Sequence, residues 1–369
     1  MDTPDSVAPG NASPTVENAS GGVRSGVITA GTWTLDRIKL IDQWPQQEHL
    51  ATIESVSEQG GGSAHNLAMA LRHLDPELPV FTSGLVGNDA DGEKLRLWAR
   101  AAGIVGDGLR CCDAASTSYT DVITDIGTGK RTFFHHRGCS DLLAAADIDL
   151  SSCRAQILHL GLVGVHALLD AAVSQPHPVT DSPGSAANGW FTVLQHARQC
   201  GLLTNLELVS IEAERLQRLV QPCLAVLDSL VVNEFELGAV AGVSTLSGGK
   251  VDRPACREAM RHIWERASLQ QLVLHYPGGA MGLTPGSELL DVPSVQVPED
   301  QIKGSVGAGD AFAAGVLYGW HQGWSLEARI RLGHATAAAS LHASDSISAI
   351  GTLDECQRLA ADYGWRDEG

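Results

Sequence analysis

The residues most capable of chemistry stand in the run GSVGAGD at positions 304–310, followed by an apolar, helix-forming stretch at 311–317. Small residues let the backbone turn tightly, and the N–H groups that open a helix lack intrahelical partners, so this run predicts a pocket of donors suited to a phosphate. Asp310 stands inside that pocket. A carboxylate there would repel a phosphate unless it accepted a proton from a hydroxyl attacking that phosphate, which points to phosphoryl transfer.

A second glycine cluster, GGGSAHN at positions 60–66, precedes a stretch with helical character. Gly61 and Gly62 allow a ligand to approach the main chain closely, and Asn66 offers both a donor and an acceptor to hydroxyl groups. The alternative is a plain strand-to-helix turn with the asparagine as a local cap. Asp36 follows a buried strand predicted at 27–31, at the sheet edge where open α/β sheets hold their ligands.

Asn233 and Glu236 form a third pair, spaced three residues apart. Their oxygen-rich side chains suit Mg²⁺, often through water, and Mg²⁺ is a normal component of phosphoryl transfer. Taken in isolation, the same pair is more simply a helix N-cap with an acidic first turn.

Together with the run GLVGNDADG at 84–92, these motifs stand in an order that resembles the ribokinase-like carbohydrate kinases, the PfkB family, over about residues 27–350. The resemblance implies ATP as phosphoryl donor, with Mg²⁺. It implies four residues that hold the hydroxyls of a sugar-like acceptor, namely Asp36, Gly61, Gly62 and Asn66. It also implies a catalytic base, Asp310, and a backbone anion hole made by Gly307, Ala308 and Gly309.

The resemblance further implies a nucleotide side, where Asn233 and Glu236 lie near the phosphates and the magnesium shell, with Glu236 acting through water. Gly279 and Gly282 match a glycine-rich loop along the nucleotide, and His334 falls where the family often has an asparagine near the adenine. This context favours the functional interpretation of the Asn233 and Glu236 pair over the capping one.

Two departures from the family pattern bear on cations and phosphates. Gly304 and Ser305 replace the usual Asp-Thr, so the aspartate that in many members helps to coordinate a monovalent cation is absent. We therefore expect a requirement for Mg²⁺ but little response to K⁺. Asn205 and Glu207 stand where many members carry an Asp-x-Asn sequence at a strand end, which makes them candidates for contact with phosphate or magnesium, although we do not favour that role.

Helical and strand-like segments alternate from residue 63 onward, which predicts an α/β fold with a doubly wound, mostly parallel sheet flanked by helices. β-prone runs in segments 37–59 and 117–137 predict a small sheet that closes over the acceptor as a lid and offers an edge for a possible homodimer. Residues 1–24 are expected to be a disordered tail before a kinase domain at 25–369, and residues 175–189 a surface insertion.

Composition restricts the function further. The 369 residues carry a net charge of −18, which disfavours partners such as nucleic acid and anionic membranes. The eight cysteines form no CxxC pair, and no apolar run approaches a membrane span, so we expect a cytoplasmic protein. The sequence thus predicts ATP-dependent phosphorylation of a primary hydroxyl of a sugar or sugar-like alcohol. A nucleoside kinase of the same fold and a non-catalytic sugar or nucleotide sensor remain alternatives.

Overall fold

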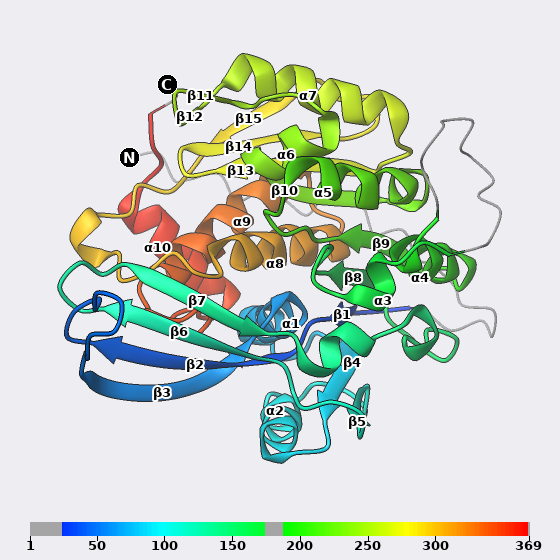
Figure 1. Cartoon of the computed structure of the whole chain (residues 1–369). Coiled ribbons are helices and arrows are strands. Elements are labelled where there is room, and N and C mark those ends of the chain that lie inside the picture. The colour runs from blue at the N-terminus through cyan, green and yellow to red at the C-terminus, as the bar shows by residue number, and fades with distance from the viewer. Residues whose placement is uncertain (1–23, 174–186, 368–369) are drawn as a thin grey trace.

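A nine-stranded sheet forms the centre of the computed structural model, which describes residues 24–173 and 187–367 (Figure 1). Within these residues the strands lie in the order β15-β14-β13-β10-β9-β8-β1-β4-β5. Their bounds are β1 (Val27–Gly31), β4 (Val80–Gly87), β5 (Leu109–Cys112), β8 (Ile157–Gly161), β9 (Leu203–Leu206), β10 (Ser229–Asn233), β13 (Gln271–Tyr276), β14 (Gly279–Leu283) and β15 (Leu290–Pro293).

All strands from β13 to β5 in that order pair in parallel, and the β13–β14 and β14–β15 pairs at one end of the sheet are antiparallel. Each of the five residues of β1 is buried, as expected of a central strand covered on both faces. The sheet order moves outward from β1 in both directions, which confirms the predicted doubly wound, mostly parallel sheet.

Helices cover both faces of the sheet and create one hydrophobic core on each (Figure 1). The first face carries α1 (Ser63–Leu74), α2 (Ala90–Ala101), α8 (Ala308–His321), α9 (Leu326–Ser340) and α10 (Leu353–Tyr363). The second carries α3 (Ala167–Asp170), α4 (Gly189–Gln199), α5 (Ala213–Val220), α6 (Glu234–Ala241) and α7 (Arg253–Arg266). Short elements complete the fold: η1 (Gly138–Leu142), η2 (Ala145–Asp147), η3 (Gln221–Val226), η4 (Glu299–Gln301), β11 (Leu246–Ser247) and β12 (Lys250–Val251).

A smaller sheet lies beside the main one, at the lower left of Figure 1, in the order β3-β2-β6-β7. Its strands are β2 (Thr34–Ile41), β3 (Ile53–Gly61), β6 (Tyr119–Asp125) and β7 (Arg131–His136), so both β-prone segments of the sequence contribute to it. The β6–β7 hairpin turns within residues 126–130, as its glycines predict. We call this sheet the lid.

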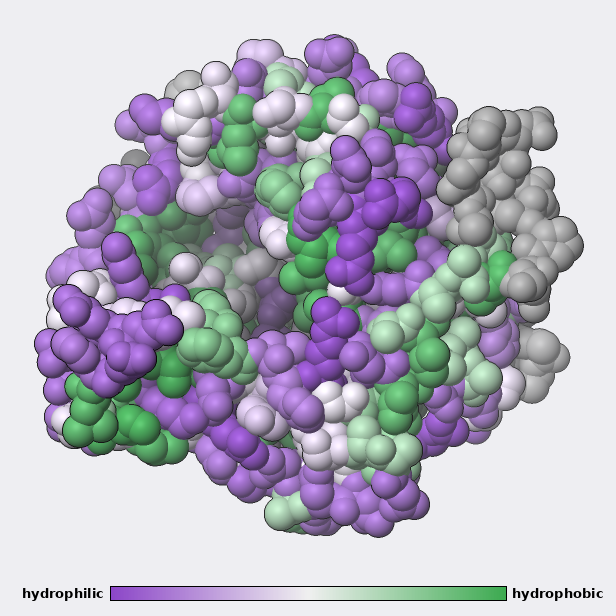
Figure 2. Space-filling model, in the orientation of Figure 1, coloured by the Kyte–Doolittle hydropathy of each residue, from purple (hydrophilic) through white to green (hydrophobic). Residues whose placement is uncertain are grey.

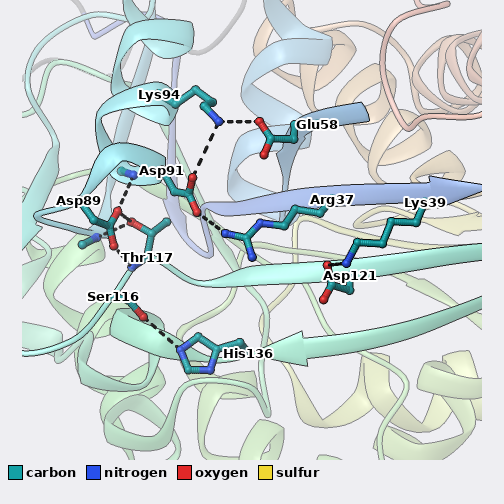
Figure 3. A network of polar contacts seen from close by, with 12 residues as sticks. Arg37, Lys39, Glu58, Asp89, Asp91, Lys94, Ser116, Thr117, Asp121 and His136 are labelled. Atoms are coloured by element: carbon teal, nitrogen blue, oxygen red, sulfur yellow. Dashed lines mark hydrogen bonds and ion pairs between the residues drawn. The ribbon is translucent and has the colours of Figure 1, made fainter. Parts of the chain in front are cut away.

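Polar contacts tie the lid to α2, as Figure 3 shows. Arg37 of β2 donates to Asp91 at 2.6 Å, and Lys94 of α2 pairs with Glu58 of β3 at 2.5 Å. Asp89, which caps α2, accepts the N–H and the hydroxyl of Thr117 just before β6. Single surface ion pairs stabilise a protein little, so the main consequence of these contacts is the orientation of the lid.

The expected tail lies outside the described residues except for Arg24. The Arg24 side chain is buried, and its guanidinium donates to the carbonyls of Cys153, Ala155 and Cys200. Most of the segment 175–189 also lies outside the described residues, whereas Asn188 caps α4 and Gly189 begins it. No helix in the described residues combines the length and apolarity that spanning a bilayer requires.

Candidate active site

The N-terminus of α8 lies at the centre of the candidate site. Gly307 caps this helix with φ of 75°, and a Cβ at this position would stand 2.2 Å from the Cβ of Ser346, so both the conformation and the space require glycine. The first regular helical bond runs from the N–H of Ala311 to the carbonyl of Gly307. The N–H of Ala308 donates to the carbonyl of Ser305 at 3.3 Å, so the N–H groups of Gly309 and Asp310 are the donors that this helix terminus offers to an anion.

Asn66 of α1 joins this helix terminus directly. Its amide Nδ2 donates to Oδ2 of Asp310 at 2.6 Å, across 244 residues of sequence. Its Oδ1 accepts from the hydroxyl of Ser346 at 3.1 Å, and the side chain is 6% exposed. A candidate acceptor residue and the candidate base thus form one hydrogen-bonded unit.

Asp36 lies on β2 against the glycines that end β3. A Cβ on Gly61 would stand 2.3 Å from Oδ2 of Asp36, so only glycine leaves room for this carboxyl group. Gly62 has φ of 86°, and a Cβ at this position would collide with the carbonyl of Thr32. The structure therefore brings the four predicted acceptor residues to one end of α1, beside Asp310.

Burial dominates the electrostatics of these carboxyl groups. Desolvation raises the pKa of Asp36 to about 7; a hydrogen bond with Thr120 opposes this shift, and the nearby Asp310 adds to it. Desolvation also raises the pKa of Asp310 well above its usual value, and the neighbouring Glu207 raises it further. Burial raises the pKa of Glu207 to about 7, and its carboxyl group lies close enough to that of Asp310 for the two to interact electrostatically.

The predicted phosphate and magnesium pair opens α6. Asn233 Oδ1 accepts from the N–H of Glu236 at 2.9 Å, and the carboxylate of Glu236 accepts from the N–H of Asn233 at 3.2 Å. The local capping interpretation is thus realised in the structure. Glu236 is 8% exposed and also accepts from Ser210, and desolvation raises its pKa.

The donor set near α6 fits Mg²⁺ chemically, because it consists of carboxylate, amide and hydroxyl oxygens. Within residues 24–173 and 187–367, however, no group of three or more His, Cys, Asp or Glu is arranged to enclose a metal ion.

The three remaining nucleotide residues lie on β14 and α9, which pack against each other. Gly279 begins β14, where a Cβ would meet the carbonyl of Val292 at 2.7 Å. Gly282 packs under α9, where a Cβ would meet Ile330 at 2.8 Å, so its smallness serves helix packing. His334 of α9 is 5% exposed, and burial lowers its pKa to about 3.

His334 belongs to an aromatic cluster. Its ring meets Phe312 at 5.0 Å and Trp365 at 6.5 Å between centroids, both edge-on, and Arg331 lies over the Trp365 ring at 4.7 Å. The chain after α10 holds Trp365 in place through an antiparallel bridge to Val295. The hydrophobic surroundings explain why the neutral imidazole is favoured.

Comparison with known proteins decides the family. The model of the pfkB family carbohydrate kinases matches residues 34–352. This chain belongs to that family. An ATP-dependent ribose-1-phosphate kinase of Halopiger xanaduensis is 26% identical to this pfkB kinase over 314 residues, which are 85% of this chain and 90% of the relative. The predicted family and the predicted sugar kinase are thereby confirmed.

Solved structures show the same fold at low sequence identity. A ribokinase of Arabidopsis thaliana complexed with ribose and ATP matches with a TM-score of 0.70 and 18% identity, covering 91% of this chain and 99% of the other. A nucleoside kinase of Burkholderia thailandensis in complex with inosine matches with a TM-score of 0.66 and 17% identity, covering 92% and 100%. These likenesses establish the ribokinase-like architecture of this pfkB kinase.

Sequence reasoning missed several residues of the site. His159 on β8 lies with Nε2 2.7 Å from Oε2 of Glu207, and burial lowers its pKa to about 4. His275, near the end of β13, lies beside the N-terminus of α8, where a Cβ on Gly309 would stand 3.5 Å from its Cε1. The sequence signal that could have identified them is their place in the chain, since His159 and His275 both lie on strands predicted for the parallel sheet.

Arg131 of the lid was also missed, and it bears on the Gly304 departure. A Cβ on Gly304 would stand only 2.7 Å from Nη2 of Arg131, so the guanidinium occupies the space that a side chain at 304 would need. A positive charge from the lid therefore lies beside the loop that leads into the anion hole of this pfkB kinase.

Proposed function

We propose that this enzyme transfers the γ-phosphoryl group of ATP to a primary hydroxyl of a sugar or sugar-like alcohol. The observation that carries the proposal is the 2.6 Å hydrogen bond from Asn66 to Asp310. This bond joins the amide of Asn66 to the buried carboxyl group of Asp310 at the N-terminus of α8, which supports an acceptor hydroxyl and a phosphate meeting there. A hydroxyl bound there has a base and an anion site within reach at once.

In the proposed reaction, the acceptor oxygen attacks the γ-phosphorus while its proton passes to a carboxylate oxygen of Asp310. The bond from the γ-phosphorus to the bridging oxygen breaks, and ADP leaves with that oxygen. The N–H groups of residues 307–309 stabilise the charge on the transferring group. When bound, Mg²⁺ would neutralise phosphate charge, with Asn233 and Glu236 as the residues that hold it through water.

Asp36 and Asn66 would orient the sugar through its other hydroxyls. A raised pKa makes Asp36 able to donate as well as accept near neutral pH, which suits a polyhydroxylated ligand. Lid closure over these residues would exclude water and so prevent hydrolysis of ATP. The use of ATP also supports the cytoplasmic location expected from the sequence.

A panel of acceptors tests this proposal. The purified enzyme with Mg²⁺ and ATP is given ribose, fructose, ribose 1-phosphate, inosine or no acceptor, and ADP formation and phosphorylated product are both measured. We expect acceptor-dependent ADP formation with a sugar. If inosine is the only acceptor that is phosphorylated, the enzyme is a nucleoside kinase. Tight binding of a sugar or of ATP without any product would instead identify a sensor.

We also propose that two copies of this chain meet through their lids. The outer strands of the lid expose large apolar side chains, with Val56 of β3 61% exposed and Phe133 and Phe134 of β7 51% and 55% exposed. Figure 2 shows apolar surface on this lower left part of the molecule. Sedimentation at micromolar concentration tests the dimer, and Val56→Glu should shift it to monomer. A wild-type monomer would contradict it.

A further inference from the structure

A row of four buried polar side chains crosses the main sheet below the active site. His159 of β8, Asn205 of β9, Ser229 of β10 and Gln271 of β13 occupy paired positions on four adjacent parallel strands. None of the four is more than 1% exposed. A continuous row of buried polar groups is costly unless its members are hydrogen-bonded, so its presence calls for a physical reason.

Hydrogen bonds connect the polar row from end to end. Gln271 Nε2 donates to Ser229 Oγ at 3.0 Å, and Ser229 Oγ donates to Asn205 Oδ1 at 2.8 Å. Asn205 Nδ2 lies 3.0 Å from His159 Nδ1. At the far end, Nη1 of Arg329 on α9 donates to Gln271 Oε1 at 3.0 Å.

The two ends of the row determine the direction of every bond in it. Arg329 can only donate, so Gln271 accepts with its oxygen and donates with its nitrogen to Ser229. The hydroxyl proton of Ser229 then points to Asn205, whose amide nitrogen donates to Nδ1 of His159. The proton of the neutral imidazole is left on Nε2, which faces Glu207.

Glu207 lies next to His159, at the end of the row that is nearer to the active site. It lies two residues beyond Asn205 on β9 and so on the same face of the sheet, with Oε2 2.7 Å from His159 Nε2. The two atoms lack hydrogen-bond alignment in this state. Such contacts commonly align only when substrate is bound.

The charged groups around Asp310 come from several elements. Glu207 directly follows β9, His159 lies on β8 and Asp36 on β2, and each interacts electrostatically with Asp310. Glu236 at the start of α6 acts on Glu207 in turn. Two adjacent carboxyl groups on the same centre repel unless a proton or a donor lies between them, and the polar row supplies a donor from below.

We propose that Glu207 is a positioning residue that holds the carboxyl group of Asp310 for proton transfer, and that the polar row from Arg329 to His159 holds Glu207. This inference rests on the proposed function. The row orients groups and exchanges no proton with the substrate, because the proton lost by the acceptor hydroxyl goes to Asp310. Arg329 thereby influences the reaction from the opposite end of the row.

The first test is Glu207→Gln, which keeps the shape and removes the charge. Loss of the negative neighbour lowers the pKa of Asp310, so the acid limb of the kcat/KM profile should move to lower pH by about 1 unit or more. A merely structural glutamate would not move that limb. An unmoved limb overturns the inference, provided that Asp310→Asn is inactive; activity in Asp310→Asn would instead overturn the proposed function.

The second test breaks the row far from the substrate. Arg329→Met should lower kcat about tenfold with little change in either KM, and Arg329→Lys, which keeps a donor, should restore most of it. Ser229→Ala should act like Arg329→Met. The matched control is Thr82→Val, which removes an equally buried hydroxyl that donates to the carbonyl of Thr29 outside the row. This control should lose stability and keep kcat.

Thermal melting and circular dichroism establish that each variant is folded before its kinetics are compared. If Ser229→Ala does not fold, the two Arg329 variants test the role of the row by themselves, since the Arg329 side chain lies at its partly exposed end. Equal kcat values in Arg329→Met, Arg329→Lys and the wild type would overturn the role of the row.

Discussion

The acceptor side and the nucleotide side of this kinase are built in different ways. On the acceptor side, Asp36, Asn66 and Asp310 come from three distant parts of the chain and act on one another directly. On the nucleotide side, Asn233 caps its own helix and His334 packs in an aromatic cluster. The acceptor side is thus a preorganised group of side chains that contact one another. On the nucleotide side, binding would depend more on main-chain groups and on side chains that act independently.

The two sides also differ in charge. Three carboxyl groups with raised pKa values, those of Asp36, Glu207 and Asp310, crowd the acceptor side because burial disfavours their charged forms. On the nucleotide side desolvation also raises the pKa of the buried Glu236 carboxyl group, but its carboxylate accepts from the N–H of Asn233 and from the hydroxyl of Ser210. Variants should therefore separate the sides: acceptor-side changes affect chemistry and sugar affinity, and nucleotide-side changes affect nucleotide affinity and helix stability.

The largest expected effect belongs to Asp310→Asn. Asparagine is nearly isosteric but cannot take the acceptor proton, so kcat should fall about 10²–10⁴-fold while both substrates still bind. Product formation under saturating conditions measures kcat, and calorimetric titration measures binding. A folded variant with most of the wild-type kcat would show that another group is the base.

Asp36→Ala should weaken the acceptor and spare the nucleotide. Removal of one buried hydrogen-bonding partner costs about 1–3 kcal/mol, which corresponds to about 5- to 150-fold in sugar affinity. Titration with the sugar and separately with ATP checks this. Weaker ATP binding with unchanged sugar binding would contradict the division into two sides.

Asn233→Ala should show the opposite pattern. The loss of an N-cap costs about 0.5–2 kcal/mol of stability, and KM for Mg²⁺–ATP should rise while KM for the sugar stays the same. Thermal melting and initial rates at varied Mg²⁺ measure the two effects. Ser325→Ala is the matched control, because Ser325 caps α9 without belonging to the site, and it should lower stability alone. If the nucleotide kinetics of Asn233→Ala are unchanged, Asn233 caps α6 and does not contribute to nucleotide binding.

Asp36→Asn should stabilise the free enzyme in a pH-dependent manner. The folded-state pKa is about 7 and the unfolded value is 3.8, so the folded state binds more protons between these limits and this group lowers stability as pH rises through them. The variant should therefore melt above the wild type at pH 8, and the difference should vanish towards pH 4. A constant difference at every pH would mean that Asp36 is not desolvated.

The smallest expected effect concerns K⁺. With Gly304 in place of a carboxylate and the Arg131 guanidinium beside it, a monovalent cation would find one ligand fewer and a repelling charge. Rates at fixed ionic strength should be similar in potassium and tetramethylammonium salts. An increase of about tenfold with K⁺ would show that a cation site persists without the aspartate.

Much of the fold could be predicted because its signals are local. The alternation of helices and strands, the β-prone runs of the lid and the small residues at 307–309 each follow from a few neighbouring residues. Gly307 illustrates this, since a turn into a helix with positive φ needs glycine whatever the rest of the chain does.

Contacts between distant segments could not be predicted in the same way. The bond between Asn66 and Asp310 depends on how α1 and α8 pack, and the role of Gly282 depends on α9 lying above β14. The pKa of Asp310 likewise depends on Glu207, which approaches it only once β9 has found its place in the sheet.

The sequence by itself determined the family, the parallel sheet and the helix terminus suited to phosphate, because these depend on periodicity and on residues that are adjacent in the chain. The tertiary structure alone decided that the buried polar row from Arg329 to His159 exists and that three carboxyl groups share one corner of the site. The physical reason is that strand order and helix packing set which side chains face each other and how much water they lose, and neither quantity is a property of neighbouring residues.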